Sequence, residues 1–222
     1  MAKKELLKEY EGDESNKKEV SRSDFPPNFF FGVATSAYQV EGAYKEGGSG
    51  PSIWDAFSHT EGKIVYKSNG DVAVDQYHRY KEDVELIAKL GFEYYRFSIS
   101  WSRIFPDGLG TKINDEGINY YNNLINALLE KDTCFASFGD RVKIWITINE
   151  PLQTAVNGYD MGGFAPGRCQ GSSIEPYLAA HHQILAHAAA VSIYRSKYKD
   201  KQGGQVGLVL DCEWAEANSE NK

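Results

Sequence analysis

The sequence has no long hydrophobic run, few cysteines and no excess of positive charge. No run of about 18 apolar residues is present, so we expect no membrane-spanning helix. The net charge is −7 and no basic stripe interrupts it, which argues against a surface for nucleic acid. Cys134, Cys169 and Cys212 are odd in number and far apart, so they match neither a metal cluster nor a disulfide framework. We expect a soluble protein without a metal or cofactor.

The first residues also lack the features of a secretory signal. Residues 1–22 are charged and contain no apolar core region, and the chain has no Asn-x-Ser/Thr acceptor for glycosylation. A cytoplasmic protein is therefore expected. Residues 1–24 are polar and aperiodic, which predicts a disordered N-terminal tail followed by one folded domain over residues 25–222.

Apolar residues make up 41% of the 222 positions, which is enough for a globular core. Apolar runs predict strands over residues 29–43, 92–99, 142–150 and 205–214. Apolar residues at helical spacing predict helices over residues 77–90, 114–129 and 176–198. Strands that alternate with helices indicate right-handed βαβ units and a parallel sheet. A closed (β/α)₈ barrel needs eight strands and about 250 residues, so four strands predict a partial TIM barrel.

One predicted strand ends in a polar pair. Its apolar, β-branched run 144–148 favours a strand covered on both faces, and Pro151 ends it because proline has no N–H for a sheet ladder. Asn149 and Glu150 therefore lie at the C-terminal tip, where parallel barrels place catalytic side chains. A carboxyl group there is partly removed from water, which suits a general acid. The structural alternative is that Glu150 caps a loop and Asn149 forms a turn.

Further polar residues are candidates for a site. The amide of Gln39 can donate and accept at once, as adjacent sugar hydroxyls require, although it could also be a satisfied loop amide. Arg96 lies inside the predicted strand 92–99, where a cation is usually paired with a carboxylate. Three histidines in the predicted helix 176–198 lack i,i+4 spacing, so we interpret them as surface or packing residues rather than metal ligands: His181, His182 and His187.

Four stretches, residues 29–43, 95–104, 146–151 and 158–168, resemble parts of one known family. The first resembles, at every defined position, the N-terminal signature of glycoside hydrolase family 1, the plant-type β-glucosidases. The second is similar to the second strand of that family, the third to its acid/base motif, and the loop 158–168 agrees as well. The resemblance runs from about residue 25 to the C-terminus, but it covers only the N-terminal half of the family pattern.

The resemblance implies retaining hydrolysis of a small-molecule β-glucoside by two carboxyl groups about 5–5.5 Å apart. It implies that Glu150 is the general acid/base and that Asn149 binds the sugar 2-hydroxyl. Gln39 would bind the far hydroxyls of the glucose, and Arg96 would lie beside the nucleophile. Position 150 is Glu rather than the Gln of the related thioglucosidases, so O-glucosides are the implied substrates.

Two departures from the family pattern concern the catalytic machinery. The nucleophile motif, a Thr-Glu-Asn-Gly-like strand end, belongs to the family's C-terminal half and does not occur in these 222 residues. Lys131 runs directly into Asp132, where the family has a turn, a third strand and a sugar-binding loop, as if one βα segment had been removed in frame. We therefore expect the first half of a barrel without its third strand. Negligible turnover is expected, because acid catalysis alone typically contributes about 10²–10⁴-fold.

Alternatives to an inactive β-glucosidase-like chain remain. The first is a non-catalytic module, which binds sugar weakly through Gln39 and Asn149 or acts as a partner of a full-length enzyme. The second is a chain that barely folds, whose second and fourth barrel strands become neighbours or unpaired edges. Unpaired edges would favour self-association.

Overall fold

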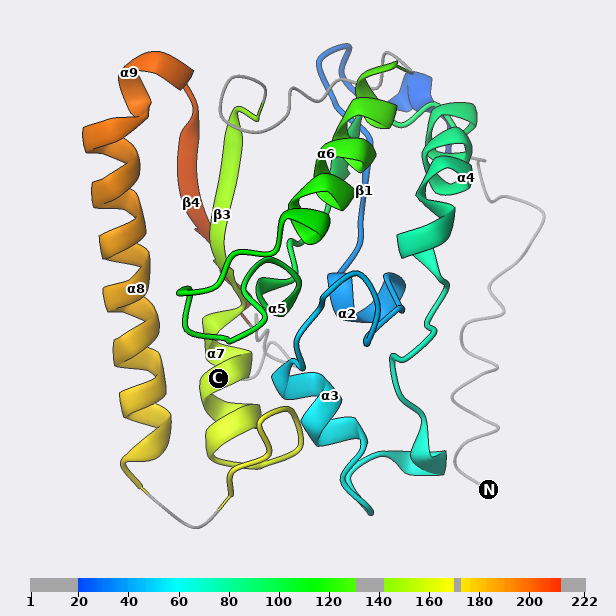
Figure 1. Cartoon of the computed structure of the whole chain (residues 1–222). Coiled ribbons are helices and arrows are strands. Elements are labelled where there is room, and N and C mark those ends of the chain that lie inside the picture. Colours follow the sequence, from blue (N-terminus) through cyan, green and yellow to red (C-terminus); the bar gives the residue numbers. More distant parts are fainter. Residues whose placement is uncertain (1–19, 131–141, 170–172, 213–222) are drawn as a thin grey trace, which may run out of the picture. The chain divides into compact units, whose positions relative to one another are not determined.

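The computed structural model describes residues 20–130, 142–169 and 173–212 (Figure 1). The chain divides into two units, Met1–Phe31 and Gly32–Lys222. The predicted disordered tail falls mostly on residues 1–19, which lie outside the described ranges, and its boundary at residue 24 stays a prediction. Among the helices in these ranges, none combines the length and the hydrophobicity that crossing a membrane requires.

The described part of the first unit holds a helical turn and a cluster of aromatic rings. The turn is η2 (Arg22–Asp24). Phe25, Phe29 and Phe31 pack with ring centroids 4.7 to 5.1 Å apart, in the tilted and edge-on arrangements that aromatic rings prefer. The Arg22 guanidinium lies 4.6 Å from the centre of the Phe31 ring. Phe29 and Phe31, which were predicted to begin a strand, therefore pack in an aromatic cluster, and the strand begins only at Gly32.

The first strand pair carries the main apolar core. β1 (Gly32–Ala34) pairs in parallel with β2 (Tyr94–Arg96), and Gly32 lies opposite Tyr94. A Cβ at position 32 would stand 2.8 Å from Tyr94, so this close approach requires glycine. Helices α4 (Gln76–Lys89) and α6 (Asp115–Glu130) contribute to the same core, and they confirm the helices predicted from apolar spacing. The buried core residues are Val84, Ile87, Tyr95, Leu124 and Leu128.

The second strand pair lies beside the long helix. β3 (Ile144–Asn149) pairs in parallel with β4 (Gln205–Val209), and α8 (Glu175–Lys197) packs against both strands (Figure 1). On α8, His187 Nδ1 lies 2.7 Å from Thr147 Oγ1 of β3, so this histidine is a packing residue as predicted. The expectation that β3 is covered on both faces is wrong for the described residues, because Ile144 is 64% exposed. Helix α8 covers the Thr147 face, and the opposite face remains open in the described part of the chain.

The remaining elements are short and connect these layers. They are α2 (Ala37–Val40), α3 (Ile53–Ser58), η3 (Val65–Lys67), α5 (Trp101–Ile104), α7 (Pro151–Gln153), η4 (Thr154–Gly158) and α9 (Lys199–Gln202).

Within the described residues, the four strands form two parallel pairs rather than one sheet. The predicted alternation of strands and helices is confirmed, and each pair joins strands that follow one another along the chain. β2 and β3 share no ladder in these ranges, so the described residues do not show them as neighbours in a sheet. The predicted junction at Lys131 and Asp132 lies outside the described residues.

Candidate active site

The tip of β3 places Asn149 and Glu150 at the C-terminal end of a parallel strand pair, as predicted. Asn149 is the last strand residue, and the N–H of Glu150 donates to the Val209 carbonyl of β4 at 2.8 Å. Glu150 then takes a left-handed conformation, with φ 49° and ψ 59°, and occupies the N-cap position of α7. Pro151 begins that helix, because proline is tolerated in a first helical turn. The strand thus ends in a sharp turn that carries the carboxyl group.

A bulge precedes this turn. Ile146 pairs with Gly207 and Asn149 pairs with Val209, so three steps along β3 match two steps along β4. Bulges of this kind bend a strand and change the direction of the side chains that follow. The direction of Asn149 and Glu150 therefore depends on the bulge as well as on strand periodicity.

Two of the predicted residues are in direct contact. Arg96 is the last residue of β2, and its Nη2 donates to the Asn149 Oδ1 at the end of β3. Both side chains are exposed, whereas Glu150 is half-buried. This hydrogen bond joins the C-terminal ends of strands from the two separate pairs. An amide oxygen, and not the expected carboxylate, is thus the described partner of Arg96.

Gln39 follows β1 and lies on the short helix α2. The N–H of Thr35 donates to the Arg96 carbonyl at 2.9 Å, and the N–H of Ala37 donates to Ser98 Oγ at 2.6 Å, so α2 begins beside the end of β2. The Gln39 side chain is exposed and makes no hydrogen bond to any residue that the structure describes. It is therefore not a satisfied loop amide in the described part of the chain. No hydrogen bond joins it there to Glu150.

A buried ion pair that sequence reasoning missed fixes α2 to its neighbours. Arg103 of α5 donates through Nε to Glu41 at 2.9 Å and through Nη2 to the Gly42 carbonyl at 3.1 Å. Tyr121 of α6 donates its hydroxyl proton to the other Glu41 oxygen at 2.5 Å. Burial and the Glu41 carboxylate raise the pKa of Tyr121 well above its usual value. The signal available in the sequence was the proximity of Glu41 to Gln39 within the stretch 29–43.

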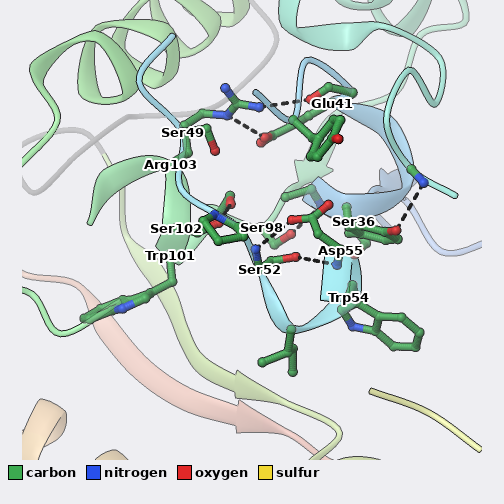
Figure 2. Close-up of a pocket in the computed structure, with 18 of the residues that line it drawn as sticks. Ser36, Glu41, Ser49, Ser52, Trp54, Asp55, Ser98, Trp101, Ser102 and Arg103 are labelled. Carbon is green, nitrogen blue, oxygen red and sulfur yellow. Dashed lines mark hydrogen bonds and ion pairs between the residues drawn. The ribbon is translucent and has the colours of Figure 1, made fainter. Parts of the chain in front are cut away.

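An open cavity of about 480 Å³ lies next to this ion pair (Figure 2). Six serines contribute to its lining: Ser36, Ser49, Ser52, Ser98, Ser100 and Ser102. Several of their hydroxyls are already bonded within the protein, as where Ser52 Oγ accepts the Asp55 N–H at the start of α3. Glu150, Asn149, Gln39 and Arg96 do not line this cavity. The candidate site is thus the row of polar groups at the strand ends, and none of these four side chains lines the cavity.

Behind Glu150, side chains connect α7 to β4 and α8. Gln153 donates through Nε2 to Asp211 Oδ2, just beyond β4, and accepts from Asn157 Nδ2. Gln183 of α8 donates to the Pro151 carbonyl at 3.2 Å. Sequence reasoning missed these residues as well, since nothing in their spacing relates Gln153 to Asp211.

Among the described residues, no three His, Cys, Asp or Glu side chains are grouped so that they could hold a metal ion. His181 and His182 are exposed on α8, which agrees with their interpretation as surface residues. The site consists of carboxyl, amide and guanidinium groups, which can exchange a proton and bind hydroxyls.

The model of glycosyl hydrolase family 1 matches this sequence over residues 21–132 and 130–222. The chain belongs to glycosyl hydrolase family 1. It is 62% identical to Beta-glucosidase 42 of Arabidopsis thaliana, over 90% of this chain and 48% of that protein. It is 56% identical to Beta-glucosidase 4 of Oryza sativa subsp. japonica, over 91% of this chain and 50% of that protein.

Solved structures of this family share the fold. A rice β-glucosidase, Os3BGlu6, matches with a TM-score of 0.82 and 47% identity, over 90% of this chain and 52% of that one. The family 1 β-glucosidase of Thermotoga maritima matches with a TM-score of 0.80 and 39% identity, over 89% and 51%. The chain thus has part of a family 1 TIM-barrel fold and spans about half the length of the relatives it matches.

The comparisons also locate an interruption. The two segments of the family match meet at residues 130–132. The alignment with Beta-glucosidase 42 extends over 236 positions although it covers only 90% of this 222-residue chain, so the relative has residues without a counterpart here.

Proposed function

We propose that these residues form the acid/base side of a β-glucosidase site, with Glu150 as the general acid/base. The observation that carries the proposal is the position of Glu150. It follows the last residue of β3, in a turn that is bonded to β4, next to an Asn149 that contacts Arg96. A half-buried carboxyl at the C-terminal end of a parallel strand is suited to protonate a leaving group. Family membership supplies the reaction class, since Beta-glucosidase 42 and Beta-glucosidase 4, which match 90% and 91% of this chain, are named for that reaction.

The neighbouring polar groups would bind the sugar. Asn149 would hold the 2-hydroxyl, and the amide of Gln39, which has no hydrogen bond to a described residue, would hold the far hydroxyls of the glucose. Arg96 would lie beside the nucleophile and orient Asn149 through their hydrogen bond. The carboxylic acid at position 150 makes O-glucosides the proposed substrates.

The proposed chemistry is retaining hydrolysis in two steps. A carboxylate attacks C1 of the sugar while Glu150 gives its proton to the glycosidic oxygen, and the C1–O bond breaks. Glu150 then takes a proton from water, whose oxygen attacks C1 and releases the carboxylate. A matching rice β-glucosidase mutant has been solved in a covalent complex with Glc, as a retaining mechanism requires. The attacking carboxylate lies outside the motifs found in these 222 residues, so we propose that this chain alone does not turn over β-glucosides.

We further propose that the fold is the first half of the barrel without its third βα unit. Two observations support it. The family match is interrupted at residues 130–132, and β2 and β3, which share no ladder with each other in the described residues, flank that interruption in sequence. One strand inserted between them would join the two pairs into one parallel sheet.

Hydrolysis of a chromogenic β-glucoside tests the catalytic part of the proposal. We expect no turnover above the uncatalysed rate from the purified chain or from its Glu150→Gln variant, because the covalent step has no nucleophile. Turnover that disappears in Glu150→Gln would support the acid/base role and show that another carboxylate serves as nucleophile.

Thermal melting with glucose tests the sugar-binding part. A ligand that binds only the folded state raises the melting temperature in a saturable way. We expect a saturable rise at high glucose concentrations that is smaller in Asn149→Ala and Gln39→Ala. Glycerol at the same osmolality is the control. An identical rise in all three proteins would contradict the assigned contacts.

A further inference from the structure

Glu150 has a backbone conformation that must be maintained by its surroundings. Its φ of 49° lies in the left-handed region, which is unfavourable for a residue with a Cβ. Such conformations persist where neighbouring groups fix them, and they are common at functional sites. The direction of the Glu150 carboxyl follows from this turn, so the groups that hold the turn also determine where the carboxyl points.

Three backbone groups around Glu150 are bonded. Its N–H donates to the Val209 carbonyl at 2.8 Å, and its carbonyl accepts the Thr154 N–H at 3.3 Å. The next carbonyl, of Pro151, accepts from Gln183 at 3.2 Å. These bonds hold the start of α7 against β4 on one side and against α8 on the other.

One side-chain pair ties α7 to β4 directly. Gln153 donates to Asp211 Oδ2 while Asn157 donates to Gln153 Oε1, so both ends of the Gln153 amide are fixed. The other Asp211 oxygen, Oδ1, is buried and has no hydrogen-bond partner among the described residues. A hydrogen bond to a carboxylate is about twice as strong as a neutral one, and it is stronger still away from water.

We propose that the Gln153–Asp211 hydrogen bond holds Glu150 in its turn, and that both are positioning residues for the acid/base carboxyl. The pair acts through the backbone, since α7 begins at the residue after Glu150 and Gln153 ends it. The inference rests on the proposed function only in naming Glu150 the acid/base. The backbone turn at Glu150 can be measured whether or not the chain hydrolyses a glucoside.

The Gln153→Glu variant tests the proposal because it places a carboxylate against Asp211. Asn157 can still donate to position 153, so the change is confined to the contact with β4. We expect the Glu150 and Thr154 amides to exchange with solvent about tenfold faster than in the unaltered chain.

A second substitution should reverse the effect. In Gln153→Glu/Asp211→Asn the donor and acceptor exchange places, since the Asn amide can donate to the Glu carboxylate. Exchange at Glu150 and Thr154 should return to within about twofold of the original rate. Asp211→Asn alone should have a smaller effect than Gln153→Glu, because the Asn oxygen can still accept from Gln153 although the charge that strengthens the bond is lost. Gln205→Glu, which adds the same charge at the exposed start of β4, is the matched control.

The Glu150 side chain supplies a second readout. Its δ-carbon resonance, assigned by its absence in Glu150→Gln, should move in Gln153→Glu and return to its original position in the double variant. Unchanged exchange together with an unchanged resonance in Gln153→Glu would overturn the proposal. If the Gln153→Glu chain does not fold, the double variant becomes the test. A double variant that also fails to fold would overturn the proposal. Turnover of the glucoside that persists in Glu150→Gln would contradict the proposed function and would leave the exchange and resonance readings unchanged.

Discussion

Arg103 is a buried cation held by one carboxylate and two aromatic rings. Its side chain is 3% exposed, and its guanidinium lies 4.4 Å from the Tyr77 ring centre and 5.7 Å from that of Tyr120. Because Glu41 is buried with it, removal of either partner leaves a charge without its counterion (Figure 2). The loss of folding free energy is then much larger than the net contribution of the intact pair to stability.

We therefore predict that Arg103→Met lowers the free energy of unfolding by about 3–5 kcal/mol. Urea denaturation measures it. Arg79→Met is the matched control, because Arg79 forms an exposed pair with Glu82 on α4 and should change stability by less than about 1 kcal/mol. Adding Glu41→Gln to Arg103→Met should recover part of the loss. Equal effects of Arg103→Met and Arg79→Met would contradict the structural role of the buried pair.

At the residue scale, the sequence was sufficient to predict the candidate residues that lie at the ends of strands. Asn149 and Glu150 follow an apolar run, and Arg96 ends another, so their meeting at one edge follows from parallel pairing. The sequence could not predict the partners that hold them. Gln153 and Asp211 are 58 positions apart, and their contact depends on how α7 docks on β4. The left-handed turn at Glu150 was equally hidden, because it arises from bonds to β4 and not from local preference.

At the element scale, α6 contains a glycine whose role is packing. Alanine normally stabilises a helix interior by about 1 kcal/mol relative to glycine. At Gly117, however, an added Cβ would stand 2.2 Å from the Arg103 carbonyl oxygen of α5. We predict that Gly117→Ala lowers the free energy of unfolding by about 1–3 kcal/mol, because α5 must move away.

Urea denaturation of a pair of variants checks this. Asn119→Ala, at an exposed position of the same helix, should be neutral or slightly stabilising because it improves helix propensity without a clash. A stabilising Gly117→Ala would show that α5 and α6 can separate freely, against the close contact in the structure.

The helices were predicted closely because apolar spacing determines them. α8 covers residues 175–197 where 176–198 was expected, and α4 covers 76–89 where 77–90 was expected. The strands were predicted less well. Residues 29–43 contain only a three-residue strand, followed by α2, since the buried Glu41 and the Ser98 hydroxyl favour a helical turn there. The apolar run of β3 indicated burial on both faces, but exposure depends on which elements cover the strand, and sequence alone does not reveal that.

At the scale of the whole molecule, β3 combines an unpaired edge with an open apolar face. Within the described residues, only β4 pairs with it, and Ile144 and Ile146 are 64% and 36% exposed. Leu210, just beyond β4, is 69% exposed. Unpaired, hydrophobic strand edges accept a strand from another chain, and natural proteins block them with charge.

We propose that the chain alone self-associates through this edge. The Ile144→Lys variant should increase the monomer fraction at a given concentration, because a lysine on an edge strand opposes pairing with a second copy. Sedimentation velocity over a concentration series measures that fraction. Val65→Lys, at a 75% exposed position of η3 outside any strand, is the control and should leave association unchanged. If both lysine variants dissociate equally, the change in net charge explains the effect and the edge of β3 does not. An unaltered chain that is monomeric at every concentration would exclude association through β3.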